Sequence, residues 1–261
     1  MKIDLHNHTF LCNHASGSPL EYATRAYELG CKYYGFSDHA PMDFDEKYRM
    51  SFAQIPKYFA MIEAVKDEFA GRMRVMTGFE VDFMERAGLM DERVLGAKCD
   101  FLIGSVHFLG GWGFDNEEFI AEYKGKDIDA LYEQYFGAVA DMARSGRFDI
   151  AGHLDLVKVF GFRPKKDVRI YAQPALKAVK EAGMVLELNA AGYRKPVGEL
   201  YPSDDLLELV AEMQIPITFS SDAHNVAQIG ANMDKAIAKA REFGFTRAAV
   251  FQNHEREMVD F

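Results

Sequence analysis

The chain begins with MKIDLHNH, residues 1–8, a short apolar run that is followed at once by two histidines. The residues Lys2–Leu5 have the composition of a β-strand. Side chains alternate in direction along an extended segment, so His6 and His8, two residues apart, point to the same side. Two imidazoles on one side can share a metal cation. This beginning therefore predicts a strand whose end binds metal, and the same feature recurs along the sequence.

Short apolar runs of this kind alternate with longer amphipathic segments along the whole chain. The predicted strands are Lys2–Leu5, Tyr33–Ser37, Arg74–Phe79, Phe101–Val106, Phe148–Ala151, Met184–Leu188 and Ile217–Ser220. The predicted helices are Pro19–Leu29, Ala53–Phe69, Asp127–Arg144, Val168–Ala182, Ser203–Glu212 and Val226–Phe243. Several helical segments end in glycine, as in Leu29-Gly30 and Ala182-Gly183, and glycine commonly ends a helix.

The unbroken alternation of strands and helices predicts a parallel α/β protein. No Ser/Pro-rich linker, low-complexity tract or internal repeat interrupts it. We therefore expect a single barrel-like domain over residues 1–261 rather than a doubly wound sheet. The stretch Gly110–Lys126 contains glycines and aromatic residues with little periodicity. It is expected to form a loop over the active face.

The composition limits the classes of partner. The chain has 261 residues, a formal net charge of −10 and a pI of about 5.3. An acidic protein repels a phosphate backbone unless bound cations or local arginines reverse the potential at one site. The charge therefore counts against a nucleic-acid partner, while a small phosphorylated ligand remains compatible with it.

The cysteines and the apolar runs indicate the cellular environment. Cys12, Cys31 and Cys99 are odd in number and scattered, so they form neither a disulfide framework nor a zinc-ribbon pattern. The first residues have no charged leader followed by an apolar stretch. No apolar run approaches the roughly 20 residues that span a bilayer. We expect a cytoplasmic protein with no membrane partner, and the sequence leaves its oligomeric state open.

Metal-binding side chains follow the predicted strands one after another. They are His6, His8, His14, His39, Glu80, His107, His153, Asp222 and His224. The carboxyl ends of parallel barrel strands converge on one site, so these side chains are expected to surround one pocket. Imidazole with carboxylate suits zinc, iron or manganese without choosing among them.

Each of these residues, taken alone, has a simpler explanation. A histidine at a strand end is more often hydrogen-bonded in the core, and Glu80 alone would be a solvated carboxylate or an ion-pair partner. Nine such residues at successive strand ends are poorly explained by independent placement. The pattern therefore favours a metal centre. His254 lies outside it, in the C-terminal tail, and is expected to be structural.

At these positions the sequence resembles the polymerase and histidinol phosphatase (PHP) superfamily. Its metal motifs match His6-x-His8, Asp38-His39, Glu80, His107, His153 and Asp222-x-His224. Four further segments resemble the monofunctional histidinol-phosphate phosphatases: Tyr48–Ser51, Gly104–Phe108, Gly111–Asp115 and Asn189–Lys195. The likeness runs across nearly the whole chain, as one PHP-type metallophosphoesterase domain.

The resemblance implies a distorted (β/α)7 barrel that holds three divalent metal ions. The first ion would take His6, His8, Glu80 and Asp222. The second would take Glu80, His107 and His153. The third would take His14, His39 and His224, and the residue type at position 14 varies within the superfamily. Arg163 and Arg194 match the family's phosphate-holding arginines, although composition alone would favour surface arginines at both positions.

The resemblance also implies an activity, the hydrolysis of L-histidinol phosphate to L-histidinol and inorganic phosphate in histidine biosynthesis. In the hypothesis that follows, a metal-bridging hydroxide attacks phosphorus, because two cations lower the pKa of shared water toward about 7. Glu80, Asp222, Arg163 and Arg194 would be catalytic. The substrate's amine and imidazole need an acidic or aromatic pocket, for which Trp112 and Asp115 are candidates.

Two alternatives remain open. One is a PHP phosphoesterase of other specificity, acting on phosphotyrosine, on phosphate esters in general or on nucleic acid. A nuclease should have a basic approach surface, and the net charge of −10 argues against one. The other is a non-enzymatic metal-binding module. It predicts missing ligands, yet all nine positions carry competent side chains.

Overall fold

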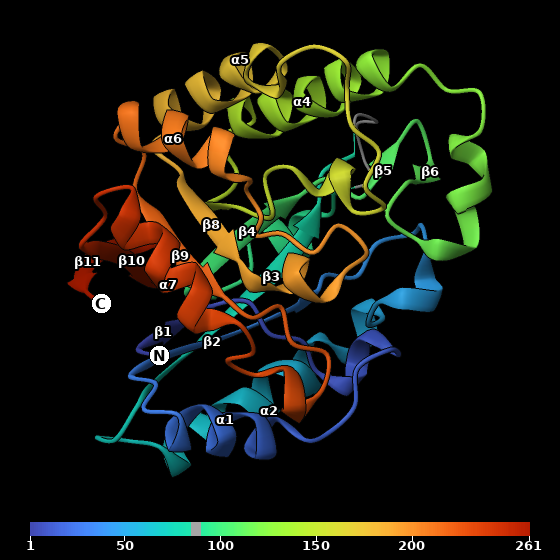
Figure 1. Cartoon of the computed structure of the whole chain (residues 1–261). Coiled ribbons are helices and arrows are strands. Elements are labelled where there is room, and N and C mark those ends of the chain that lie inside the picture. Colours follow the sequence, from blue (N-terminus) through green and yellow to red (C-terminus); the bar gives the residue numbers. More distant parts are fainter. Residues whose placement is uncertain (85–89) are drawn as a thin grey trace.

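Seven parallel strands form the central sheet in a computed structural model that describes residues 1–84 and 90–261 (Figure 1). Their order in the sheet is their order in the chain, β1-β2-β3-β4-β7-β8-β9. The strands are β1 (Ile3–Asp4), β2 (Tyr33–His39), β3 (Arg74–Asp82), β4 (Phe101–Ser105), β7 (Ile150–Ala151), β8 (Val185–Asn189) and β9 (Ile217–Ser220). A doubly wound sheet would reverse its strand order partway, so this order fits a barrel.

The first and last strands of the sheet meet and nearly close it. The amide of Leu5 donates to the carbonyl of Phe219 at 3.0 Å, and the amide of Asp222 donates to that of His6 at 2.8 Å. A short parallel bridge joins Asn7 to Ala223 just beyond the strands. The expected single-domain, distorted seven-stranded barrel is thus confirmed.

The helices lie outside the sheet and bury their apolar faces against it (Figure 1). They are α1 (Pro19–Glu28), α2 (Ile55–Glu68), α4 (Ile128–Arg144), α5 (Val168–Glu181), α6 (Asp204–Glu212) and α7 (Met233–Glu242), with the short α3 (Glu92–Leu95) between β3 and β4. The start of α1 shows how local sequence sets a boundary. Ser18 and Glu21 form a reciprocal capping box, and Pro19 occupies the first turn, where it loses no hydrogen bond.

Two glycines let a large aromatic side chain fill the barrel. A Cβ at Gly78 would lie 2.6 Å from the ring of Phe101, and one at Gly35 would lie 2.9 Å from the same ring. Both distances are below 3.0 Å, which real Cβ contacts essentially never show. Glycine in β2 and β3 therefore makes room for Phe101, which is fully buried.

The structure differs from the expected elements in three places. The predicted helix Val226–Phe243 is divided into a 3-10 turn, Val226–Gln228, and α7, because Gly230 and Asn232 between them have φ of 71° and 60°. The predicted loop Gly110–Lys126 contains β6 (Trp112–Gly113), which pairs with β5 (Phe108–Leu109), and a 3-10 run, Glu117–Tyr123.

The third difference is a C-terminal hairpin of β10 (Arg247–Gln252) and β11 (Glu255–Asp260), which the periodicity did not indicate. Its backbone meets the amino ends of the barrel strands: Thr218 donates to the carbonyl of Ala249 at 2.8 Å, and Arg74 donates to that of Phe251 at 3.1 Å. The hairpin therefore covers the end of the barrel opposite to the strands' carboxyl ends.

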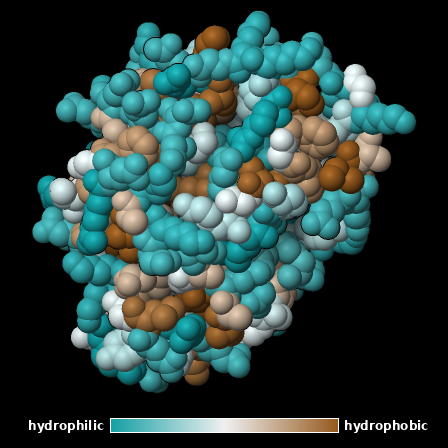
Figure 2. All heavy atoms as spheres, in the orientation of Figure 1, coloured by the Kyte–Doolittle hydropathy of each residue, from teal (hydrophilic) through white to brown (hydrophobic). Residues whose placement is uncertain are grey.

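The described residues contain no helix that is both long enough and apolar enough to cross a bilayer. On the face seen in Figure 2, hydrophilic side chains cover most of the surface and hydrophobic ones gather in separate patches.

Candidate metal centre

A cavity of about 640 Å³ opens at the carboxyl ends of the strands. Seven of the nine predicted metal ligands line this cavity: His14, His39, Glu80, His107, His153, Asp222 and His224. Asp115 and Arg194 line the same cavity. His6 and His8 are fully buried beneath these residues. The structure thus brings together all nine side chains that the strand-end pattern singled out.

Glu80 lies at the centre of this cluster, on β3, which is between β2 and β4 in the sheet. Its Oε2 atom is 3.3 Å from His6 Nε2 and 3.0 Å from His39 Nδ1. Its Oε1 atom faces the other way, 2.9 Å from His153 Nε2 and 3.4 Å from His107 Nε2. The two oxygens of one carboxylate therefore serve two separate groups of imidazoles, as a bridge between two cations requires.

The first group lies where β1 meets β9. His8 Nε2 is 3.1 Å from Asp222 Oδ1 and 3.7 Å from Glu80 Oε2. The ligand atoms of His6, His8 and Asp222 lie within 4.8 Å of one another. Two ligand atoms bound to one zinc ion, each by a bond of about 2.0–2.3 Å, cannot be farther apart than about twice that length, and the ligand atoms of these residues lie about that close together. These three residues and Glu80 can therefore hold one cation.

The second group joins β3, β4 and β7. His107 Nε2 and His153 Nε2 are 3.2 Å apart, and both face Glu80 Oε1. Two imidazole nitrogens at this distance repel each other unless a proton or a cation lies between them. Glu80, His107 and His153 also have their ligand atoms within 4.8 Å of one another.

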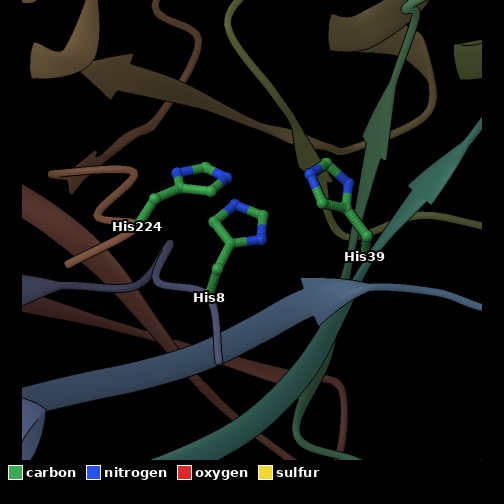
Figure 3. A group of neighbouring side chains, drawn as sticks. All are labelled: His8, His39 and His224. Atoms are coloured by element: carbon green, nitrogen blue, oxygen red, sulfur yellow. The ribbon is translucent and has the colours of Figure 1, made fainter. Parts of the chain in front are cut away.

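The third group is made of His39 at the end of β2 and of histidines that follow β1 and β9. Figure 3 shows His8, which follows β1, between His224, which follows β9, and His39 at the end of β2. The ring of His8 stacks on that of His224 with centroids 4.0 Å apart and lies 4.4 Å from that of His39. His14 is close by, 4.7 Å from His224 and 5.2 Å from His39 between ring centroids.

The electrostatics of the cluster act in two directions. At His6, His8 and His107 the neighbouring carboxylates outweigh burial and raise the pKa, so a bound cation would displace a proton from each of these imidazoles. Burial lowers the pKa of His39 to about 4 and lowers that of His224 well below its usual value, so both imidazoles are neutral. Burial opposes the ionisation of Glu80 and Asp222. The neighbouring histidines outweigh it, however, and hold the pKa of both carboxyls well below the ordinary range.

Unsatisfied nitrogens test whether a cation fits. His6 Nε2 and His39 Nδ1 are buried and have no hydrogen-bond partner among the described residues, although both approach Glu80 Oε2. Buried polar atoms are nearly always paired. Nitrogen lone pairs that converge on a carboxylate oxygen without a hydrogen bond are the environment that a divalent cation satisfies. The donor set therefore fits bound metal.

Two carboxylates behind the ligands were not predicted from the sequence. Asp82 accepts from His107 Nδ1 at 2.6 Å and from the buried Arg49 at 2.8 Å. Glu187 accepts from His6 Nδ1 at 2.7 Å and from the amide of His153 at 2.7 Å. The bonds from His107 Nδ1 and His6 Nδ1 fix the tautomer of each ring that leaves Nε2 free for a cation.

A signal for both residues was present in the sequence. Asp82 lies two positions after Glu80 in β3, so the two side chains are on the same face of the strand. Glu187 is a carboxylate between Leu186 and Leu188 in a buried strand, where it needs partners.

The predicted phosphate and substrate residues are placed unequally. Arg194 lines the cavity: Nη2 donates to the carbonyls of Ser221 at 2.7 Å and Asp222 at 3.0 Å, while the buried Nη1 has no partner among the described residues. Arg163 is not brought to this cavity. It lines a second one of about 750 Å³ and pairs with Glu199 at 2.5 Å.

Asp115 and Trp112 also differ in position. Asp115 lines the cavity, and burial raises the pKa of its carboxyl. Trp112 is not among the lining residues; its ring packs edge-on against Tyr123 at 4.8 Å and beneath the ammonium of Lys126 at 4.2 Å. His254 lies on the C-terminal hairpin and donates to Asp149 at 2.8 Å, away from the cavity.

Comparisons with known proteins agree with this geometry. The family described as PHP domain matches residues 4–191. A protein of Deinococcus radiodurans described as "Probable histidinol-phosphatase" is 45% identical over 97% of this chain and 98% of its own. The "Histidinol-phosphatase" of Bacillus subtilis is 31% identical over 88% of this chain and 96% of its own.

A solved structure has the same fold. It is the histidinol phosphate phosphatase of Lactococcus lactis complexed with zinc, L-histidinol and phosphate. It superposes with a TM-score of 0.84 at 23% identity and covers 98% of each chain.

Asp82→Asn should weaken metal binding without removing a ligand. The amide is a poorer acceptor than the carboxylate for the proton on His107 Nδ1, so His107 becomes a weaker ligand. We expect affinity at the second group to fall by about 10- to 100-fold. Competition with a chelator, followed by elemental analysis, measures this. Asp149→Asn, which weakens the matching bond to His254 at the other end of the barrel, is the control and should leave metal binding unchanged.

Proposed function

The chain belongs to the PHP domain family, and from that membership we propose that it is a metal-dependent histidinol-phosphatase. It hydrolyses L-histidinol phosphate to L-histidinol and inorganic phosphate, a step of histidine biosynthesis. The observation that carries the proposal is the position of Glu80, whose two oxygens face separate groups of imidazoles at the floor of a cavity. Relatives at 45% and 31% identity that bear this activity in their names support the substrate.

Three divalent cations, of zinc, iron or manganese, are proposed as the cofactors. His6, His8, Glu80 and Asp222 would hold the first, Glu80, His107 and His153 the second, and His14, His39 and His224 the third. When bound, such ions act as Lewis acids that lower the pKa of water and neutralise charge on the phosphate.

Arg194 is the residue of this chain best suited to hold the phosphate. Its Nη2 is anchored on the carbonyls of Ser221 and Asp222, so the guanidinium is fixed in direction, and its free Nη1 can donate a charge-assisted bond to a non-bridging oxygen. Arg163 can take part only if it exchanges its ion pair with Glu199 for the substrate.

Asp222 is proposed to relay a proton in the same reaction. Its Oδ1 is 3.1 Å from His8 Nε2, and its Oδ2 accepts from Asn189 at 3.1 Å, so the carboxylate is held at the first group beside Arg194. Glu80 acts by holding the first and second groups in a fixed relation. The distance between the reacting atoms then depends on a rigid strand rather than on a loop.

The other end of the substrate carries an ammonium group and an imidazole. Asp115 offers a carboxylate on the wall of the cavity, and Phe108, Phe119 and Phe160 line the same wall with aromatic rings. We assign the ammonium to Asp115 because its carboxylate lines the cavity and is not one of the proposed metal ligands. Trp112 supports this wall through its packing on Tyr123.

Turnover of histidinol phosphate by purified protein, together with elemental analysis, tests the proposal. Glu80→Ala should lower metal content and abolish turnover, because it removes the bridge between the first and second groups. His254→Ala, at the far end of the barrel, should keep both. Aryl phosphates, a phosphotyrosine peptide and single-stranded DNA are assayed in parallel. Robust hydrolysis of one of these, without hydrolysis of histidinol phosphate, would show that the substrate assignment is wrong.

Arg194→Ala should leave metal content intact and raise KM for histidinol phosphate. The loss of a charge-assisted bond is worth about 1.5–3 kcal/mol, or about 10- to 100-fold in kcat/KM. Arg163→Ala is the matched arginine variant, and with Arg163 paired to Glu199 it should have the smaller effect. Wild-type kinetics for Arg194→Ala would remove the phosphate assignment, and a larger loss for Arg163→Ala would transfer it to that residue.

Asp115→Asn should discriminate between substrates. It removes a negative charge that faces the ammonium of histidinol phosphate, so KM for this substrate should rise by about tenfold or more. An aryl phosphate has no ammonium, and its kcat/KM should change by less than a factor of about three. Equal losses on both substrates would place Asp115 with the metal chemistry instead.

A further inference from the structure

The thiol of Cys12 lies against the third group of histidines, although neither the strand-end pattern nor the family motifs include it. The ligand atoms of Cys12, His14 and His224 lie within 4.8 Å of one another. Those of Cys12, His8 and Asp38 do as well. Cys12 is fully buried, so its sulfur is held among nitrogens and a carboxylate rather than in solvent.

A short, well-defined turn puts the sulfur there. The residues Phe10–Cys12 form one turn of 3-10 helix, capped at its start by Thr9, whose hydroxyl accepts from the amide of Leu11 at 3.2 Å. Asn13 ends the turn with φ of 69° and donates to the carbonyl of Arg49 at 2.9 Å. The chain thus folds back directly after His8, and Cys12 and His14 return toward the cluster.

The surroundings of Cys12 differ from those of the other two cysteines. Cys31 donates to the carbonyl of Tyr33 at 3.2 Å, and Cys99 donates to that of Phe101 at 3.5 Å, so both behave as buried structural thiols. Burial raises the pKa of all three thiols, so position alone distinguishes Cys12: its sulfur lies within 4.8 Å of ligand atoms of His14 and His224.

We propose that Cys12 is a thiolate ligand of the third cation site, where it acts together with His14 and His224. The inference rests on the proposed function only in requiring that cations occupy the cavity. As the metal–sulfur bond forms, the S–H bond breaks, the proton passes to solvent, and a sulfur lone pair is donated to the cation.

A sulfur ligand changes which ion the site prefers. Thiolate with imidazole selects zinc or iron, whereas carboxylate with imidazole also accepts manganese. Zinc–sulfur bonds of about 2.3 Å and zinc–nitrogen bonds of about 2.0–2.1 Å are compatible with ligand atoms that already lie this close together. The third site would then differ chemically from the first and second, which have oxygen and nitrogen ligands alone.

Cobalt(II) reports the bond directly. The purified full-length chain, loaded with Co²⁺ under reducing conditions, should show a sulfur-to-cobalt charge-transfer band in the near ultraviolet. Cys12→Ser should abolish this band and retain the visible bands of cobalt bound at the nitrogen and oxygen sites. Cys31→Ser and Cys99→Ser are the matched controls and should keep the charge-transfer band. When zinc and manganese compete for the protein, Cys12→Ser should also change the ratio of their affinities at the weakest site by about tenfold or more in favour of manganese.

The wild-type spectrum is decisive even if Cys12→Ser fails to fold. Cobalt that binds wild-type protein without a charge-transfer band overturns the proposal, and so does a band that survives in Cys12→Ser or disappears in Cys31→Ser or Cys99→Ser. The proposed function is judged separately, by turnover of histidinol phosphate. A protein that shows the band but does not hydrolyse histidinol phosphate refutes the function and leaves the ligand assignment standing.

Discussion

The structure of the site depends on one buried carboxylate that lies between two sets of imidazoles. Glu80 is nearly inaccessible to solvent, and a charge in that position is strongly unfavourable unless it is compensated. Imidazole nitrogens face it from both sides, those of His6 and His39 at Oε2 and those of His107 and His153 at Oε1, where bound cations would compensate the charge. Its position in the sheet therefore determines where cations at the first and second groups would lie.

Closure of the barrel also brings together His6, His8 and Asp222, the first group of proposed ligands. The bonds that join the two edges of the sheet run from Asp222 to His6 and from His8 to Ala223, at 2.8 and 3.0 Å between backbone atoms. They therefore connect the residues that carry the ligands. A cation bound by His6, His8 and Asp222 would stabilise the closed barrel, because it binds only the folded arrangement.

Two further carboxylates, Asp82 and Glu187, hold the proposed ligands in position. Asp82 connects His107 to Arg49, and Glu187 connects His6 to the backbone of His153. Each lies on a strand rather than a loop, so the imidazoles are oriented by the most rigid part of the molecule. The segments after the strands supply Arg194, Asp115 and the turn that carries Cys12.

The amino-acid sequence by itself determined the alternation of strands and helices, the barrel and the ligand types at the strand ends. These follow from local properties: hydrophobic periodicity, glycine at helix ends and the chemistry of each side chain. Only the tertiary structure decided that Asp82 and Glu187 support the ligands, that Arg163 pairs with Glu199 away from the cavity, and that a hairpin covers the far end of the barrel. These depend on which side chains face one another across strands distant in sequence, and a local pattern contains no record of those encounters.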